Sequence, residues 1–307
     1  MSVPIRLNKL LAQLGVGSRR ACEQLAYHGR ITVNNLPITK NVLVHRSNDV
    51  VKIDNIMIPL NQQLQPCMYM YNKPIGEIVA YKSHTNPLQP TQSYTTIYHT
   101  INTKYQHIVS NKRLIYCGRL DLTTTGLLLL TTNPAIATHM TTSTVKRIYN
   151  VIATVPNTIN SIINNYTSNN TLIHDKVIGI PQYMIEQISR VGITIDDVRY
   201  KPIQIKLTHT TPNHNELHYT VELIEGKNRE IRRLFQYFNL YIKSLTRIQY
   251  GDYILPNTMK PGELRQVPIS SMLQHLVDGT QHPSPSNQTK HSKSYNNSNK
   301  RYETQTT

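Results

Sequence analysis

The sequence predicts an α+β protein with a small N-terminal domain, made of two helices and a small sheet, and a larger domain built on a central, mostly antiparallel sheet. Three observations carry this prediction. Leucines recur at helical spacing near the start of the chain, alternating apolar and polar residues recur in short runs between residues 68 and 250, and four consecutive leucines at 127–130 indicate a buried strand.

Two short helices are expected at the start of the chain. The first covers residues 6–14, where positions i, i+3, i+4 and i+7 form one apolar face: Leu7, Leu10, Leu11 and Leu14. Ser18 is a suitable N-cap for a second helix over about 19–28, and Gly29 is its expected stop. These residue types at both ends predict a compact helical hairpin.

A small curled sheet is expected to follow the helices. Ile31 and Val33 alternate with polar residues, Asn34-Asn35 indicates a turn, and the apolar residues of 50–53 suggest a closing strand. We therefore divide the chain into an N-terminal domain over 1–60, a linker over 61–67, a larger domain over 68–276 and a tail over 277–307.

The larger domain contains most of the predicted strands. They are expected at 68–72, 114–117, 126–131, 146–155, 203–209, 217–224 and 244–250. Helices are expected at about 134–141, where Pro134 suits the first turn, and at about 228–238. Residues 82–110 give no clear assignment, and 157–200 indicate a polar helix with loops. The tail is rich in Gln, Ser, Asn and Thr with almost nothing apolar, so we expect it to be disordered.

The charge balance favours a polyanionic partner. The formal net charge is +16 over 307 residues. Residues 1–60 alone carry eight Lys and Arg against three acids. A generally basic proteome would produce the same excess, so charge alone does not settle the partner.

Other classes of protein are disfavoured. Three widely spaced cysteines without a CxxC pair indicate neither a disulfide framework nor a zinc site, and the 13 histidines form no ligand pattern. No run of 18 apolar residues suggests a membrane span, and the domain pattern begins too early for a signal peptide. We expect a cytoplasmic monomer without metal or other cofactor.

The segment 118–131 is the strongest candidate for a catalytic site. Its sequence is Gly-Arg-Leu-Asp-Leu-Thr-Thr-Thr-Gly followed by four leucines and Thr. Asp121 therefore lies on a loop directly before a buried strand, and loops on rigid scaffolds are where catalytic groups concentrate. Taken in isolation, an Asp here is more often a helix cap or a carboxylate that organises the loop.

Further motifs change that balance. They follow one another in a fixed order: Tyr71-Asn72-Lys73-Pro74-Ile75-Gly76, the Asp121 segment, Lys146-Arg147-Ile148-Tyr149, Glu225-Gly226-Lys227-Asn228-Arg229-Glu230-Ile231-Arg232-Arg233-Leu234, and Arg247-Ile248-Gln249-Tyr250-Gly251. Together they resemble the RsuA/RluB family of ribosomal RNA pseudouridine synthases, and residues 6–33 resemble the S4 RNA-binding domain that precedes the catalytic domain in most of that family. The likeness covers roughly residues 5–268.

The resemblance implies an activity and roles for particular residues. The family isomerises uridine to pseudouridine in ribosomal RNA without a cofactor. It implies that Asp121 attacks the nucleotide or removes a ribose proton, that Tyr149 stacks on the flipped base, and that Arg232 orients the aspartate. Ile231 is expected to pack in the pocket wall. The segment 228–233 resembles members that act on large-subunit RNA, while small-subunit RNA stays an alternative.

Contacts with RNA are expected from both domains. Positively charged side chains would hold phosphates without reading sequence, and those expected to do so are Arg6, Lys9, Arg19, Arg20, Arg30, Lys73, Arg119, Lys227, Arg229 and Arg233. The partner would be ribosomal RNA or a precursor ribosomal particle. Three other hypotheses stay open: an S4-type RNA-binding or ribosome assembly protein without activity, a degenerate synthase, and a structural ribosomal component.

Overall fold

The structure of the chain is a computed structural model. It describes residues 3–62, 65–83, 85–86, 89–109, 112–142, 144–155, 179–211 and 216–278, with side chains left undescribed at 85–92. From residue 279 onward the predicted disordered tail lies outside the described residues. Residues 277 and 278, which we assigned to that tail, form the end of helix α9 (Ser271–Asp278).

The N-terminal module contains the expected pair of helices, α1 (Leu7–Gln13) and α2 (Arg19–Tyr27). The Ser18 hydroxyl caps α2 by accepting a 3.0 Å hydrogen bond from the Ala21 amide. Leu7, Leu10 and Leu11 are buried in one small core. The leucine spacing therefore predicted the correct helix and the correct buried face.

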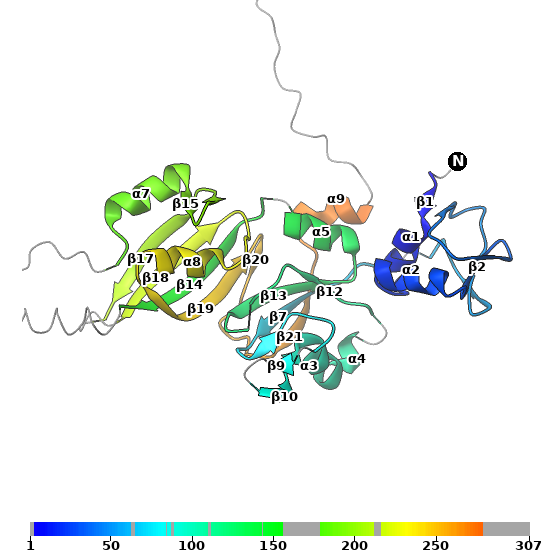
Figure 1. The fold of residues 1–307 in the computed structure, drawn as a ribbon, viewed down its shortest axis with the longest axis horizontal. Coiled ribbons are helices and arrows are strands. Elements are labelled where there is room, and N and C mark those ends of the chain that lie inside the picture. Colours follow the sequence, from blue (N-terminus) through cyan, green and yellow to red (C-terminus); the bar gives the residue numbers. More distant parts are fainter. Residues whose placement is uncertain are drawn as a thin grey trace, which may run out of the picture.

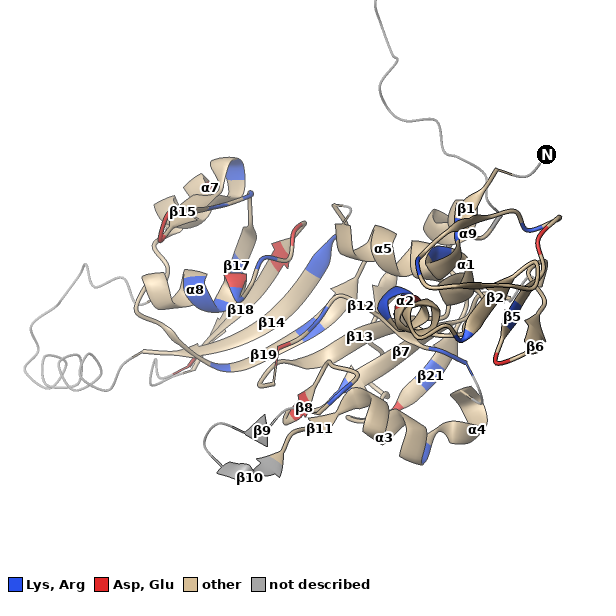
Figure 2. Cartoon of the chain, turned by 45° about the vertical axis from the view of Figure 1, so that its right-hand side comes forward, with Lys and Arg blue, Asp and Glu red and all other residues tan. Residues whose placement is uncertain are grey.

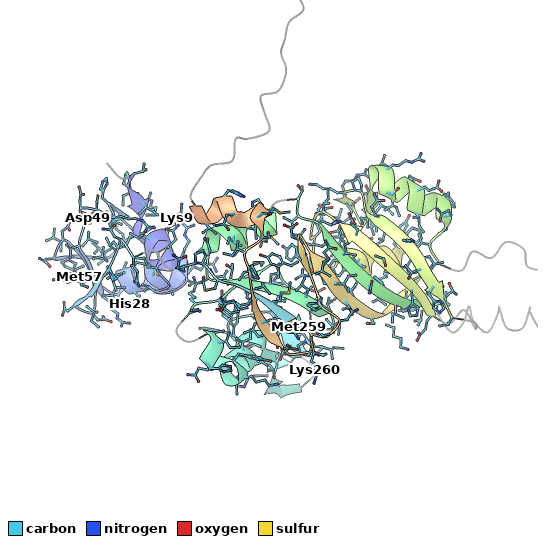
Figure 3. The ribbon with its side chains drawn as sticks, turned by 180° about the vertical axis from the view of Figure 1, so that it is seen from behind. Lys9, His28, Asp49, Met57, Met259 and Lys260 are labelled. Carbon is cyan, nitrogen blue, oxygen red and sulfur yellow. The ribbon has the colours of Figure 1, made fainter. Side chains whose placement is uncertain are left out.

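A four-stranded antiparallel sheet completes the module. Its order is β3 (Leu36–Ile38), β2 (Ile31–Val33), β5 (Val51–Ile53) and β6 (Ile56–Ile58), and β1 (Ile5–Arg6) pairs separately with β4 (Leu43–Val44). Asn34 and Asn35 both have positive φ, at 53° and 66°, in the β2–β3 turn. Asparagine tolerates that region better than other non-glycine residues, so the hairpin forms without a glycine. Figure 3 shows this module from behind, marked by Lys9, His28, Asp49 and Met57.

A nine-stranded sheet is the scaffold of the larger domain (Figure 1). Seven strands follow one path: β17 (Gln204–Thr210), β18 (Glu216–Leu223), β14 (Arg147–Thr154), β19 (Tyr241–Tyr250), β13 (Thr125–Thr131), β7 (Met68–Lys73) and β21 (Leu264–Val267). Two short strands lie off this path, β12 (Ile115–Cys117) on β13 and β20 (Tyr253–Ile254) on β19. The predicted α+β class with a mostly antiparallel sheet is confirmed.

The sheet consists of two antiparallel halves joined by a single parallel pairing. That pairing links β13 to β19 through Thr125 opposite Thr246 and Gly126 opposite Arg247. Gly126 has φ +96°, and a Cβ there would collide with the backbone of Arg247. Only glycine allows the two strands to approach so closely at that conformation.

Helices cover the two faces of the sheet and explain the four-leucine run. On one face Leu127 and Leu129 pack in the core that includes helix α5 (Pro134–Thr142) and α9. On the other face Leu128 and Leu130 pack in the core that includes α3 (Ile97–Lys104), α4 (Gln106–Val109), α7 (Gln182–Val191) and α8 (Glu230–Tyr237). Figure 1 shows α5 and α9 on one side of β13 and α3 and α4 on the other. Because side chains alternate along a strand, all four leucines are buried.

The segments without a clear assignment form short elements around the sheet. Residues 82–110 contain β9 (Thr85–Asn86), β10 (Gln89–Ser93), β11 (Thr95–Thr96), α3 and α4, and β11 pairs with β8 (Glu77–Ile78). After the undescribed residues 156–178, α7 is followed by the hairpin β15 (Ile193–Ile195) and β16 (Val198–Tyr200). These strands are too short for an alternation pattern to be visible in the sequence.

Candidate active site

The loop that carries Asp121 is held from beneath by Lys73. The Lys73 ammonium, fully buried at the end of β7, donates to the carbonyls of Pro74 and Thr124 at 2.9 Å and to Leu122 at 3.5 Å. Burial lowers the pKa of Lys73 to about 8, opposed by the nearby acids. The RNA contact predicted for Lys73 is therefore wrong, because its side chain has no exposed surface and braces the loop instead.

A cavity of about 380 Å³ opens beside this loop. Six of the residues singled out from the sequence as catalytic or RNA-binding line it: Arg119, Asp121, Tyr149, Lys227, Arg229 and Arg232. Ile231 also lines the cavity, as expected, and is 5% exposed. These residues come from the β12–β13 loop, from β14, and from the first turn of α8 and the loop before it, so segments far apart in the sequence meet at one place.

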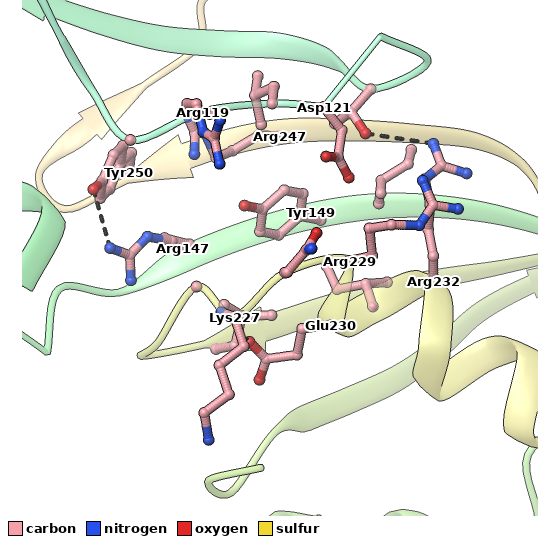
Figure 4. A pocket seen from close by; sticks show the side chains of 18 of the residues that line it. Arg119, Asp121, Arg147, Tyr149, Lys227, Arg229, Glu230, Arg232, Arg247 and Tyr250 are labelled. Carbon is pink, nitrogen blue, oxygen red and sulfur yellow. Dashed lines mark hydrogen bonds between the residues drawn. The ribbon is translucent and has the colours of Figure 1, made fainter. Parts of the chain in front are cut away.

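Asp121 and Tyr149 face each other across the cavity. In Figure 4 the Asp121 carboxylate points toward the Tyr149 ring. Tyr149 lies on β14 and is 8% exposed, so its ring is fixed by packing. Among the residues that the structure describes, the Asp121 side chain makes no hydrogen bond or ion pair. Its carboxylate is therefore not used to hold its own loop together.

Arg232 is attached to the loop rather than to the carboxylate. Its guanidinium donates to the Thr123 carbonyl at 3.3 Å and the Thr124 hydroxyl at 3.4 Å, and no ion pair within 4.0 Å joins it to Asp121 in the described part of the chain. Burial lowers the pKa of Arg232, the nearby Arg229 lowers it further, and Asp121 opposes both. Arg232 thus lies close enough to Asp121 for an electrostatic interaction while it braces the loop.

The sequence did not single out a buried cluster at the other end of the cavity. Arg147 and Arg247 are 5% and 2% exposed, and their guanidinium carbons lie 4.7 and 4.6 Å from the centre of the Tyr250 ring. Arg147 donates to the Tyr250 hydroxyl at 3.0 Å, and this hydroxyl donates to the Met140 carbonyl. Arg147 stands two residues before Tyr149 on the same strand, so both side chains lie on one face of the sheet. This spacing is the feature of the sequence that could have identified Arg147 as a residue of the cavity.

Glu230 is a buried acid in the cavity wall. It is 4% exposed at the first turn of α8, where one carboxylate oxygen accepts a 3.0 Å hydrogen bond from the Lys227 amide. Its other oxygen is buried and has no hydrogen-bond partner among the described residues. Burial raises the pKa of Glu230 to about 7, with Glu225 adding to this and the Lys227 amide, Lys227 and Arg147 opposing it.

This raised pKa predicts a pH dependence of stability. Between the ordinary pKa of 4.5 and about 7, the folded state binds the Glu230 proton more tightly than the unfolded state does, so the free energy of unfolding falls as pH rises through that window. Glu230→Gln should remove this loss and stabilise the protein at pH 8 relative to wild type by on the order of 1 kcal/mol or more. Urea unfolding at pH 5 and pH 8 measures it, with the half-exposed Glu222→Gln as the control. An unchanged pH dependence would refute this assignment.

The remaining basic residues are divided between exposed and paired positions. Lys9, Arg19 and Arg20 are exposed on α1 and α2, and Arg6 donates to the Asn41 carbonyl at 3.3 Å. Arg30 follows α2 and forms an ion pair with Asp54. Arg233 is half-buried on α8 and does not line the cavity.

The described residues show neither a metal-binding cluster nor a helix that could span a membrane. They contain no cluster of three or more His, Cys, Asp and Glu side chains placed to hold a metal ion. None of the helices in the described ranges combines the length and the apolar character that crossing a membrane requires.

Comparison with known families gives two matches. Residues 68–237 match the model of the RNA pseudouridylate synthase family, and residues 5–51 match the S4 domain. The first range contains the loop of Asp121, Tyr149 on β14 and the start of α8. The second contains α1, α2 and the strands β2 and β3 of the small sheet.

Individual relatives agree with these matches. An uncharacterized RNA pseudouridine synthase of Rickettsia typhi is 32% identical over 282 residues, which cover 89% of this chain and 98% of the relative. The ribosomal large subunit pseudouridine synthase B of Xylella fastidiosa is 30% identical over 266 residues, and this chain spans about half of its length (49%). A crystal structure of a pseudouridylate synthase, 17% identical, has a TM-score of 0.52 and covers 90% of this chain and 100% of its own, a likeness of fold.

Proposed function

Because this chain belongs to the RNA pseudouridylate synthase family, we propose that it isomerises one uridine of ribosomal RNA to pseudouridine. The observation that carries the proposal is the placement of Asp121 on a braced loop, with its carboxylate unpaired and facing Tyr149 in a cavity lined by basic residues. Large-subunit RNA is the favoured substrate, which agrees with what the name of the relative from Xylella fastidiosa says of that protein. The protein would act in the cytoplasm as a monomer.

The chemistry requires one carboxylate and a closed pocket. Pseudouridine formation breaks the bond between ribose C1′ and uracil N1 and forms a bond between C1′ and C5. C5 loses its proton and N1 gains one, so the nucleotide is isomerised without an oxidant, a reductant or an added group. Asp121 would start the reaction as an ionised carboxylate, by attack on the nucleotide or by removal of a ribose proton. Arg232 supports either step by bracing the loop and adding positive charge beside the carboxylate.

The uridine must leave its stack before Asp121 can reach it. Enzymes that act on a base pay for unstacking and recover part of the cost by stacking the flipped base on an aromatic ring. Tyr149 is the candidate for that contact, because its ring is fixed on β14 and borders the same space as Asp121. Its hydroxyl is also a candidate for moving the proton at C5.

Basic residues on both modules support the binding of a polyanion. Figure 2 shows Lys and Arg on α2, along β14 and β19, and on α8. On α2 the exposed residues Arg19 and Arg20 have no ion-pair partner within 4.0 Å in the described ranges, whereas Arg30 is paired with Asp54. Contacts of this kind would position RNA through its phosphates, while the cavity selects the nucleotide.

Charge reversal on α2 tests the RNA-binding role of the N-terminal module. Arg19→Glu combined with Arg20→Glu should weaken RNA binding and lower the slope of log affinity against log salt by about one to two units, because each lost phosphate contact releases roughly one counterion fewer. Binding isotherms over a range of salt concentrations measure it. Lys260→Glu, on the turn before β21 and away from the N-terminal module in Figure 3, is the control. A wild-type slope in the double variant would argue against RNA contact by α2.

Mapping pseudouridines in ribosomal RNA tests the function as a whole. RNA from cells that carry the wild-type protein or Asp121→Asn would be compared site by site, and each missing site would be tested with the purified protein on an RNA fragment. We expect one site in large-subunit RNA to be lost and then restored in vitro. A lost site in small-subunit RNA would change the assigned substrate. Identical maps together with an inactive purified protein would favour an RNA-binding or assembly protein.

A further inference from the structure

The cluster of Arg147, Arg247 and Tyr250 contains two buried positive charges without a counter-ion. Neither arginine forms an ion pair within 4.0 Å in the part of the chain that the structure describes. Their hydrogen bonds to described residues go to uncharged groups: Arg147 donates to the Val145 carbonyl, the Met140 carbonyl and the Tyr250 hydroxyl, and Arg247 donates to the Leu127 carbonyl.

One guanidinium nitrogen of Arg247, Nη2, is buried and has no hydrogen-bond partner among the described residues. Burying a cation is costly unless an anion or a full set of acceptors compensates it. Glu230, an acid that lines the same cavity, accepts from the Lys227 amide and makes no ion pair with Arg147 in the described ranges. An anion from outside the chain would supply the missing partner.

The cluster also borders the cavity. Arg147, Arg247 and Tyr250 all line it, together with the exposed Arg119 and Lys227. In Figure 4 the labelled arginines Arg119, Arg147 and Arg247 lie on one side of Tyr149, and Arg232 lies on the other. The cavity thus has a cationic end that is separate from the end lined by Asp121 and Arg232.

We propose that the Arg147–Tyr250–Arg247 end of the cavity is a subsite for a backbone phosphate of the RNA, next to the flipped nucleotide. The proposal rests on the proposed function, because RNA is the polyanion that would enter the cavity. Guanidinium groups suit this ligand, since their planar donors match phosphate oxygens. A phosphate held there would fix the strand and convert binding energy into alignment of the ribose with Asp121.

The competing explanation is purely structural. Arg147 and the Tyr250 hydroxyl both donate hydrogen bonds to the Met140 carbonyl in α5. Arg247 donates a hydrogen bond to the Leu127 carbonyl of β13. Cation–π contacts with Tyr250 and these carbonyls could satisfy both arginines without a ligand. The first test must therefore measure ligand binding in the wild-type protein, and any variant must be judged by a quantity that a loss of stability alone would not change.

Nitrogen-15 NMR of the arginine Nε–H groups measures ligand binding in the wild-type protein. The wild-type protein would be titrated with uridine 5′-monophosphate, with uridine and with inorganic phosphate, and the two resonances would be assigned with Arg147→Lys and Arg247→Lys. We expect saturable shifts at Arg147 and Arg247 with the monophosphate, at a concentration at least about tenfold lower than with uridine. Inorganic phosphate should compete. Shifts confined to exposed arginines such as Arg19 and Arg20, or no shifts, would overturn the subsite.

Arg147→Gln extends the test to RNA. In the Asp121→Asn background it should weaken RNA binding about tenfold and lower the salt slope by about one unit, with partial recovery in Arg147→Lys. A structural role alone would lower the melting temperature and leave the slope unchanged, which would contradict the proposal. Phosphate-dependent shifts in a protein that forms no pseudouridine would refute the proposed function and leave the subsite standing. Pseudouridine formation without those shifts would support the proposed function and refute the phosphate subsite.

Discussion

Asp121→Asn in the purified protein should lower the rate of pseudouridine formation at least ~10³-fold and change RNA affinity by less than about threefold. The large kinetic effect is expected because the amide can neither attack the nucleotide nor accept a ribose proton. The small binding effect is expected because one lost negative charge matters little among many basic contacts. Single-turnover kinetics and filter binding on the same RNA fragment measure the two quantities.

The structure makes this substitution a clean test. Lys73 and Arg232 hold the loop through backbone carbonyls and the Thr124 hydroxyl, and the Gly76 amide donates to the Leu122 carbonyl at 2.9 Å. None of these bonds uses the Asp121 carboxylate, so the loop should keep its shape in the variant. Asp252→Asn, on the exposed β19–β20 turn, is the matched control and should retain activity. Equal losses of rate and affinity in Asp121→Asn would instead assign the carboxylate to the structure of the loop.

Gly126→Ala should destabilise the protein by about 3 kcal/mol or more. The residue has φ +96°, and the new Cβ would meet the backbone carbonyl and amide of Arg247, which cannot move without breaking the pairing of β13 with β19. That pairing is the junction of the two halves of the sheet, and the cavity lies beside it. Activity should therefore fall together with stability.

Alanine substitutions at two other glycines measure the effect of backbone strain without a steric collision. Gly76 and Gly262 have φ +89° and +79°, and a Cβ at either position would meet nothing within 4 Å. Gly76→Ala and Gly262→Ala should therefore cost only the strain of the backbone, on the order of 1 kcal/mol. Urea unfolding of the three variants compares them directly. If Gly126→Ala lowered the free energy of unfolding no more than the two control substitutions do, the new Cβ would not collide with Arg247. That result would contradict the close approach of β13 and β19.

Local patterns in the sequence were sufficient for much of the fold. The leucine spacing in 6–14 identified α1 and its buried face, and Ser18 marked the start of α2. The strand at 244–250 in fact begins at Tyr241, and the helix at 228–238 begins at Glu230, after Arg229 in the left-handed conformation. Ends of elements depend on caps and neighbouring strands, which a repeat of apolar residues does not report.

What the sequence by itself determined was the loop of Asp121 before a buried strand, the motif positions of Tyr149 and Arg232, and a basic N-terminal pair of helices. The loop and the helices follow from residues close together in the chain, whose spacing is set by the periods of helix and strand. Tyr149 and Arg232 were identified by the resemblance and order of their motifs. Only the tertiary structure decided that Lys73 is buried beneath the loop, that Arg30 pairs with Asp54, and that Arg147, Arg247 and Tyr250 form a cluster. The reason is register: the pairing of β14 with β19, and of β19 with β13, joins residues up to about 120 positions apart, and no local pattern encodes that alignment.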